Sequence, residues 1–287
     1  MKILIIGASG MLGKPVTREL IRSGFDCSLL ARDPDKMKAI FPEADIIQGD
    51  VLDPESLNKA MTDMDAVYCN LSVSQDSREK DAQPEREGID NIILSARQNR
   101  IKRLACISSL VHRYEGMNGF HWWAFAIKAA AVQKIKSSGI PYTLFYPSTF
   151  METFPYQMIR GNKIANLGTS VAPMWFIAAE DYALQVAASF RLLTNESREY
   201  SIQGPEAFTF ETANRVFAAH YTKQKLGIMK APIWLAKILG VFKQSFHYGW
   251  HICEALNKYP EQFESDQSWK ELGKPAITLA EYAASLK

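Results

Sequence analysis

The sequence has few cysteines and lacks the spacings typical of metal sites and hydrolases, and these shortages exclude several classes of protein. Four cysteines among 287 residues form no Cys-x-x-Cys pair, so we expect buried, reduced thiols in a cytoplasmic protein. No arrangement of histidine, cysteine and carboxylate residues has metal-ligand spacing, so no metal is expected. The absence of a Gly-x-Ser-x-Gly sequence argues against a hydrolase nucleophile.

The sequence also lacks an excess of one charge and a long apolar run. A net charge of +2 with interspersed signs argues against a surface for nucleic acid or for an anionic membrane. The longest apolar stretch, residues 231–242, is interrupted by Lys237 and is too short to span a bilayer. We expect it to form a core or lobe helix, with a peripheral membrane contact through residues such as Trp234 as the alternative. Because an apolar strand is expected to start at residue 2, we expect no signal peptide before it.

That first strand, residues 2–6, ends in closely spaced glycines. Gly7 suits a tight turn, Gly10 suits close approach of the backbone to a pyrophosphate, and Gly13 suits close packing of a helix on the strand. A helix over residues 11–23 would direct its free amide groups at the anion. The turn therefore predicts a dinucleotide site. Its expected contacts are Gly7, Ser9, Gly10, Met11, Leu12 and Gly13.

Strand and helix signals alternate over the first half of the chain, which predicts an α/β fold. We expect a Rossmann-type doubly wound parallel sheet with a smaller C-terminal α+β substrate lobe. Residues 1–150 form the expected NAD(P)-binding domain and residues 151–287 the lobe, although the chain can cross back to the sheet near this approximate boundary. Expected strands are 26–31, 44–48, 65–69, 103–107, 141–146, 199–203 and 225–229; expected helices include 84–100, 121–138, 180–192, 209–221 and 278–286.

The ends of the second and third strands carry candidate contacts for the adenosine half of a dinucleotide. An arginine at the end of the second strand accommodates a ribose 2′-phosphate, whereas an acidic residue there bonds a free hydroxyl. Here Arg32 comes first, Lys36 is near, and Asp33 is expected to cap a helix, which favours NADP, with NAD as the alternative. Asp50, followed by Val51, is a candidate acceptor for the adenine amino group; a structural turn is the alternative.

The next three strands end in candidate contacts for the nicotinamide half. Asn70 and Leu71 follow the fourth strand, and Ser108 follows the fifth. Tyr146 and Pro147 close the sixth strand. Carboxyl ends of parallel strands share one edge of the sheet, so these residues are expected to meet there. Ser108 would orient a substrate or cap its loop; His112 and His121 are further candidates for contact with a ligand.

In their order and spacing these segments resemble an atypical short-chain dehydrogenase/reductase of the NmrA-like or isoflavone-reductase-like group. The matching segments are residues 7–13, 31–36, 49–51, 107–109 and 138–143. The resemblance implies an NAD(P)-binding Rossmann domain and, in active carbonyl reductases, a tyrosine four residues before a lysine. Lys128 matches the lysine, but Ala124 occupies the position of the tyrosine and cannot transfer a proton.

Two functions are compatible with this departure. Quinone-reductase-like and isoflavone-reductase-like relatives lack the tyrosine and have a lysine at this position. If the chain resembles them in function, Lys128 would be the general acid or would polarise the substrate oxygen. This predicts NADPH-dependent reduction of a small carbonyl, quinone or conjugated compound. In the alternative, the chain is a dinucleotide-binding regulator or assembly factor without turnover. Lys128 shares a helix face with Ala124 and Val132, which predicts an inward position. The expected partners are the dinucleotide and a small substrate, in a monomer or homodimer.

Overall fold

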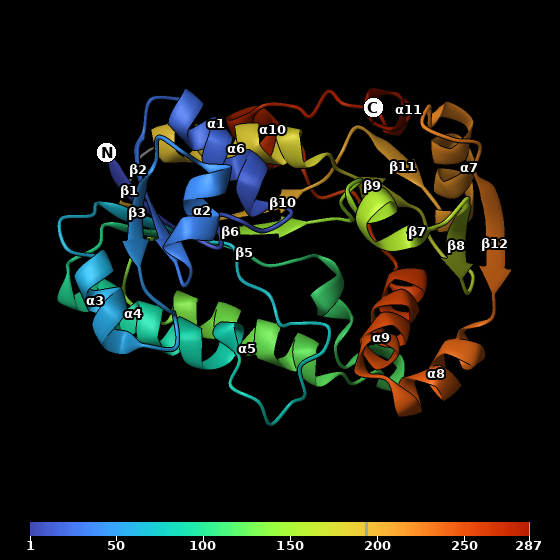
Figure 1. Ribbon diagram of the computed structural model, residues 1–287, viewed down its shortest axis with the longest axis horizontal. Helices are drawn as coiled ribbons and strands as arrows, with labels where there is room; N and C mark the ends of the chain where they lie inside the picture. Colours follow the sequence, from blue (N-terminus) through green and yellow to red (C-terminus); the bar gives the residue numbers. More distant parts are fainter. Residues whose placement is uncertain (193–194, 287) are drawn as a thin grey trace.

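A seven-stranded parallel sheet forms the centre of the molecule (Figure 1). The computed structural model describes residues 1–192 and 195–286. The strand order is β10-β6-β5-β4-β1-β2-β3, so the order reverses between β1 and β4, which is where such sheets bind dinucleotides. The strands are β1 (Lys2–Ile6), β2 (Asp26–Ala31), β3 (Asp45–Gln48), β4 (Ala66–Cys69), β5 (Arg103–Ile107), β6 (Tyr142–Pro147) and β10 (Arg198–Ile202).

Helices cover both faces of this sheet (Figure 1). One face carries α1 (Gly13–Arg22), α2 (Pro34–Ile40), α6 (Ala179–Arg191) and α10 (Asp266–Leu272). The other carries α3 (Pro54–Ala60), α4 (Ile89–Gln98) and α5 (Trp123–Lys136). Apolar side chains alternate along the strands between two buried clusters, one under each helical layer. The predicted Rossmann-type doubly wound α/β fold is confirmed.

Aspartates cap two of the helices, and one of them, Asp33, is the cap expected from the sequence. The side chain of Asp33 accepts a hydrogen bond from the amide of Lys36, and Asp53 accepts one from the amide of Glu55. In each case proline follows the cap, where its missing N–H costs no hydrogen bond. The predicted use of Asp33 as a cap is confirmed.

Some predicted helices differ from the observed ones near their starts. The helix expected over residues 11–23 starts at Gly13, because residues 7–12 remain in the turn. The helix expected over residues 84–100 divides into a π-helical turn, Pro84–Gly88, and α4. The carbonyl oxygen of Gln83 accepts the amides of the three residues at the end of this turn, which widens it. The widened turn places Glu85 in a buried position.

The strand near residue 199 was expected in the lobe, but it belongs to the main sheet. β10 pairs in parallel with β6, and Ile202 lies opposite Pro147 in the register. α6 precedes it and packs on α1, so the chain crosses back to the Rossmann layers after residue 178. Parallel pairing explains the return, because it needs a long crossover connection such as α6.

The remaining elements form a lobe beyond the carboxyl edge of the sheet (Figure 1). It contains a sheet of β12, β8 and β7 and a β9–β11 pair around a third apolar cluster. No helix in the described ranges is long and apolar enough to cross a membrane. The elements of the lobe are β7 (Ile159–Arg160), β8 (Lys163–Leu167), β9 (Met174–Phe176), β11 (Glu206–Phe208), α7 (Phe210–His220), β12 (Gly227–Ala231), α8 (Ile233–Phe242), α9 (Gln244–Lys258) and α11 (Leu279–Ser285).

Candidate functional site at the carboxyl edge of the sheet

In the glycine turn between β1 and α1, the room for a side chain differs from one glycine to the next. A Cβ atom on Gly7 would lie 2.2 Å from the carbonyl oxygen of Asn70, and one on Gly13 would lie 2.0 Å from that of Gly7. Both positions therefore require glycine for the fold itself. At Gly10 the nearest atom would be 3.4 Å away, and the residue is exposed. The fold does not need glycine at this position, but a ligand approaching the backbone would.

The start of α1 leaves amide groups available to such a ligand. The first residue before the helix is Leu12, which provides no side-chain cap, and no acidic residue lies in the first turn. Free amides and the positive end of the helix dipole favour an anion here. The turn and the helix start thus fit the pyrophosphate of a dinucleotide.

The end of β2 places the predicted ribose contacts close together but in different environments. Arg32 is exposed, and within residues 1–192 and 195–286 no hydrogen bond or ion pair engages its side chain. The ammonium group of Lys36 instead lies 3.1 Å from Asp33 Oδ2. Asp33 is therefore occupied by the backbone and by Lys36. Arg32 is the residue whose charge is available to a ligand.

At the end of β3, the two predicted adenine contacts, Asp50 and Val51, already accept hydrogen bonds within the protein. Asp50 Oδ1 accepts the amide of Leu52 at 3.0 Å, so Asp50 does have the structural role given as the alternative. The carbonyl oxygen of Val51 accepts a hydrogen bond from Asn91 Nδ2. Asp50 is only half-buried, and among the residues that the structure describes its second carboxylate oxygen has no donor.

Lys128 lies inside the protein at the ends of β4 and β5. Its side chain is only 16% exposed, and its ammonium group pairs with Glu85, whose side chain is 5% exposed. Glu85 also accepts the amide of Val73, so the loop after β4 is tied to the same carboxylate. The inward position predicted from the helix register agrees with these contacts, since Ala124 and Val132 are buried on the same face.

A small cavity of about 20 Å³ adjoins this pair. Its lining includes three predicted residues, Leu71, Ser108 and Lys128, together with Glu85. A volume of this size accommodates about one water molecule. The fold thus gathers the predicted nicotinamide contacts of β4, β5 and α5 around a buried ion pair.

Glu85 was not predicted. It stands 43 positions before Lys128 and on a different element, so no local spacing connects the two. The one available signal is a carboxylate directly after Pro84 at a helix start, which ordinarily indicates only a favourable interaction with the helix dipole.

His112 contacts Ser108 and Ser109 in the loop after β5. Its Nδ1 lies 3.3 Å from Ser108 Oγ and also contacts the carbonyl oxygen of Ser109. Burial, together with the positive charges of Lys128 and Arg113, lowers the pKa of His112 to about 4, against the opposing effect of the Ser109 contact. The imidazole is therefore neutral near pH 7, and with Nδ1–H donating to Ser109 its Nε2 is an acceptor. His121 is exposed and pairs with Glu115, away from this group.

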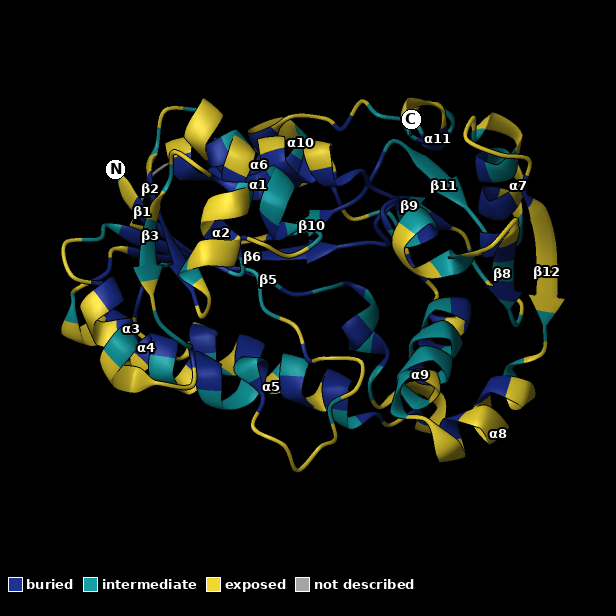
Figure 2. Ribbon diagram, in the orientation of Figure 1, coloured by how far each residue is buried: buried dark blue, intermediate teal, exposed yellow. Residues whose placement is uncertain are grey.

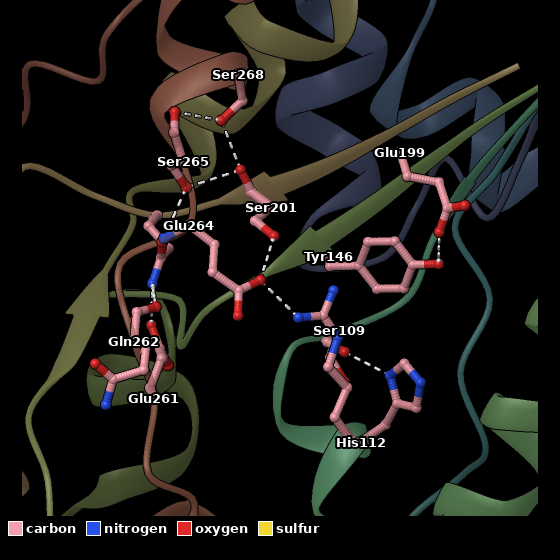
Figure 3. Close-up of polar contacts among 12 residues, drawn as sticks. Ser109, His112, Tyr146, Glu199, Ser201, Glu261, Gln262, Glu264, Ser265 and Ser268 are labelled. Carbon is pink, nitrogen blue, oxygen red and sulfur yellow. Dashed lines mark hydrogen bonds and ion pairs between the residues drawn. The ribbon is translucent and has the colours of Figure 1, made fainter.

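Tyr146 at the end of β6 faces a different cavity (Figure 3). Its hydroxyl donates to Glu199 at 2.7 Å, and burial, together with this contact, raises the pKa of Tyr146 far above its usual value. The ring stacks with His112 on one side, and the Arg113 guanidinium lies 5.0 Å from its centroid. This polar cavity of about 170 Å³ has Glu264 and Ser201 on its other wall. The structure does not bring Tyr146 to Lys128. The Pro147 carbonyl is used by the amide of Leu110.

The position of the absent tyrosine is filled by core packing. Ala124 is 3% exposed, and the aromatic residues around it pack on α9. Trp122 stacks on His251 with ring centroids 5.2 Å apart and meets Tyr248 edge-on. These contacts make the aromatic residues around Ala124 part of the core. The hairpin of α8 and α9 is thereby fastened to the start of α5.

The topology, the glycine turn and the open start of α1 define a dinucleotide-binding protein of Rossmann type. Residues 7–172, more than half of the chain, match the NAD(P)H-binding family. The chain belongs to this NAD(P)H-binding family, and the predicted likeness to atypical short-chain reductases is confirmed. In the part of the chain that is described, no group of three or more His, Cys, Asp or Glu residues is placed to hold a metal ion.

Similar proteins include both reductases and assembly factors. A (4-alkanoyl-5-oxo-2,5-dihydrofuran-3-yl)methyl phosphate reductase of Streptomyces griseus is 26% identical, over 79% of this chain and 77% of that protein. The photosystem II assembly factor Ycf39 of Cyanophora paradoxa is 24% identical, over 89% of this chain and 79% of its own.

Solved structures share the fold across the whole chain. The Citrobacter sp. triphenylmethane reductase complexed with NADP(H) has a TM-score of 0.77 at 17% identity, covering 99% of this chain and all of its own. An NADPH-dependent quinone oxidoreductase from Escherichia coli complexed with NADPH has a TM-score of 0.73 at 20% identity, covering 99% of each chain.

Proposed function

We propose that this protein is an NADPH-dependent reductase of a small carbonyl, quinone or similar conjugated compound. The observation that carries the proposal is the buried ammonium group of Lys128, held at the carboxyl edge of the sheet beside Ser108. A lysine kept in a desolvated position by a single carboxylate is more typical of a functional site than of a surface helix. The reductases among its relatives and structural neighbours support the same reaction class.

The chemistry assigned to the chain is electrostatic and acid–base. Bound NADPH supplies the hydride. As hydride adds to the substrate, negative charge develops on its oxygen, and Lys128 faces that charge and donates a proton to the oxygen. The Ser108 hydroxyl orients the oxygen, while Glu85 holds the lysine side chain in place through its ion pair. Solvent returns the proton to Lys128 after the product leaves.

The preference for NADP is part of this proposal and rests on Arg32. A guanidinium group forms paired, charge-assisted hydrogen bonds with phosphate. Arg32 has no competing partner in the described residues, whereas Asp33 is occupied by Lys36 and by its own helix start. A 2′-phosphate at the end of β2 would therefore meet a free positive charge.

The experiment is a search for turnover. The purified protein is mixed with NADPH and a panel of quinones, enones and small ketones, and the loss of nicotinamide absorbance is followed. We expect at least one quinone or enone to be reduced, with NADPH favoured over NADH. Tight NADPH binding without oxidation by any acceptor would contradict the proposal.

A second function is favoured by two observations. Ala124 stands where a tyrosine would transfer the proton, and the cavity beside Lys128 holds only about 20 Å³. A protein that binds the dinucleotide and responds to it, as a regulator or assembly factor, needs neither the hydroxyl nor the space. The similarity to Ycf39 fits this alternative. Robust turnover of any substrate in the panel would exclude it.

A further inference from the structure

The outer helix of the lobe exposes an apolar surface. α8 packs on α9 through its smallest residues, Ala236 and Gly240, which are buried. Its other sides point away from the protein, and Val241 and Phe242 are 79% and 85% exposed. Figure 2 shows this helix and the neighbouring β12 as largely exposed. We call this the α8 face. Its residues are Trp234, Leu235, Ile238, Leu239, Val241 and Phe242.

A helix that is apolar on most sides is normally buried, so this one indicates a binding surface. The helix has 10 residues and is therefore about 15 Å long, half the thickness of the hydrocarbon core of a bilayer. It is too short to cross a membrane but long enough to lie in its interface. Tryptophan and phenylalanine beside lysines are the residues that interfacial helices use.

The sequence segment that contains the α8 face carries charge of one sign. Residues 212–253 contain six lysines and arginines and no aspartate or glutamate. The net charge of the whole chain is only +2, so the rest of the protein carries an excess of negative charge. Positive and negative charges are mixed along the chain as a whole, which argued against an anionic membrane, but they are not mixed in this segment.

Most of these lysines are free to meet a partner. Lys237 is the exception, with its ammonium group 2.7 Å from Glu254. Among the residues that the structure covers, no carboxylate pairs with the exposed side chains of Lys223, Lys225, Lys230 and Lys243. Lys230 and Lys243 flank α8 at its two ends, so positive charge borders the apolar surface.

We propose that the α8 face docks this protein on an anionic membrane surface. The apolar side chains enter the interface, and the flanking lysines meet the lipid headgroups. A second copy of the chain fits this surface less well. A symmetric contact would bring the exposed lysines that flank α8, Lys230 and Lys243, toward their copies in the second chain, which disfavours it.

The test is flotation of the full chain with vesicles. At low salt we expect binding to mixed phosphatidylglycerol–phosphatidylcholine vesicles, and about tenfold weaker binding to phosphatidylcholine alone or at high salt. The double variant Val241→Asp/Phe242→Asp should lose about tenfold or more in affinity for the mixed vesicles. Val171→Asp is the matched control, because Val171 is 68% exposed elsewhere on the lobe, and it should bind like wild type.

The lysines are tested in the same assay. Lys230→Glu/Lys243→Glu should weaken binding to the mixed vesicles, whereas Lys270→Glu, an exposed lysine on α10, should not. All variants are checked for unchanged NADPH affinity, so a failure of folding is distinguished from a loss of docking. Absence of wild-type binding at low salt, or equal losses in the test and control variants, would overturn the proposal. So would a concentration-dependent dimer that Val241→Asp/Phe242→Asp dissociates without any vesicle binding.

Discussion

Lys128 and Glu85 form an almost completely buried ion pair that joins α5 to the turn before α4. Charges in such a position are costly unless they compensate one another. The pair is therefore both a structural connection and the source of the positive charge assigned to the reaction.

The variant Glu85→Gln should destabilise the protein strongly. It removes the charge that compensates Lys128 and should lower the free energy of unfolding by about 3 kcal/mol, measured by urea denaturation. The double variant Glu85→Gln/Lys128→Met should recover much of this loss, because no unpaired charge remains. Asp90→Asn is the control: it breaks the more exposed pair between Asp90 and Lys134 and should change stability by less than about 1 kcal/mol. Equal effects at positions 85 and 90 would contradict the account.

The glycine turn predicts opposite effects at two positions. Gly13→Ala would place its methyl group against the Gly7 carbonyl, and it should cost about 2 kcal/mol or more of stability. Gly10→Ala meets no atom closer than 3.4 Å, so its stability should change by less than about 1 kcal/mol. Its methyl group would occupy the approach of the pyrophosphate, and NADPH affinity should fall about tenfold or more. Thermal melts and calorimetric titration separate the two effects. Unchanged NADPH binding by Gly10→Ala would contradict this site.

The ribose contact is tested by Arg32→Ala. Loss of a charge-assisted contact should weaken NADP binding about tenfold or more and leave NAD binding nearly unchanged. Arg18→Ala, which removes an exposed arginine from the surface of α1, serves as the control. Calorimetric titration of both cofactors measures the ratio. If Arg32→Ala binds both as wild type does, the preference has another source.

Glu152 should make stability depend on pH. Burial raises the pKa of this carboxyl group from 4.5 to about 7, despite a hydrogen bond from the amide of Ala179. The folded protein therefore holds a proton that the unfolded chain releases, and stability falls as the pH rises from about 4.5 to 7. Glu152→Gln should match wild type near pH 4 and exceed it by about 3 kcal/mol at pH 8. Denaturant midpoints across this range measure the difference. Glu43→Gln is the control, because Glu43 is exposed, and it should leave the pH dependence of stability unchanged. An equally unchanged pH dependence in Glu152→Gln would refute the assignment.

Local signals predicted much of the fold because they depend on near neighbours. The strand at Arg103–Ile107 was predicted to the residue, and Asp33 was predicted as a cap. The helix register correctly placed Lys128 on the side of Ala124. These features follow from hydrophobic alternation, capping chemistry and helical spacing, all of which are readable within about ten residues.

Long-range features were not predictable in this way. The pairing of β10 with β6 depends on a crossover that no local pattern specifies. Glu85 reaches Lys128 only because Pro84–Gly88 forms a π-helical turn. The exposure of α8 was likewise hidden, since an apolar helix in the sequence has the same pattern whether it lies in a core or on a surface.

The most direct test of the central claim measures hydride transfer in Lys128→Ala under single-turnover conditions with saturating NADPH and the best quinone or enone acceptor. Loss of a general acid should slow the step by about a hundredfold or more, while NADPH affinity stays within a few-fold of wild type. Lys134→Ala, six positions along α5 and also ion-paired, should react at the wild-type rate. A hundredfold loss confined to Lys128→Ala is the predicted result; an unchanged rate in Lys128→Ala would contradict its catalytic role.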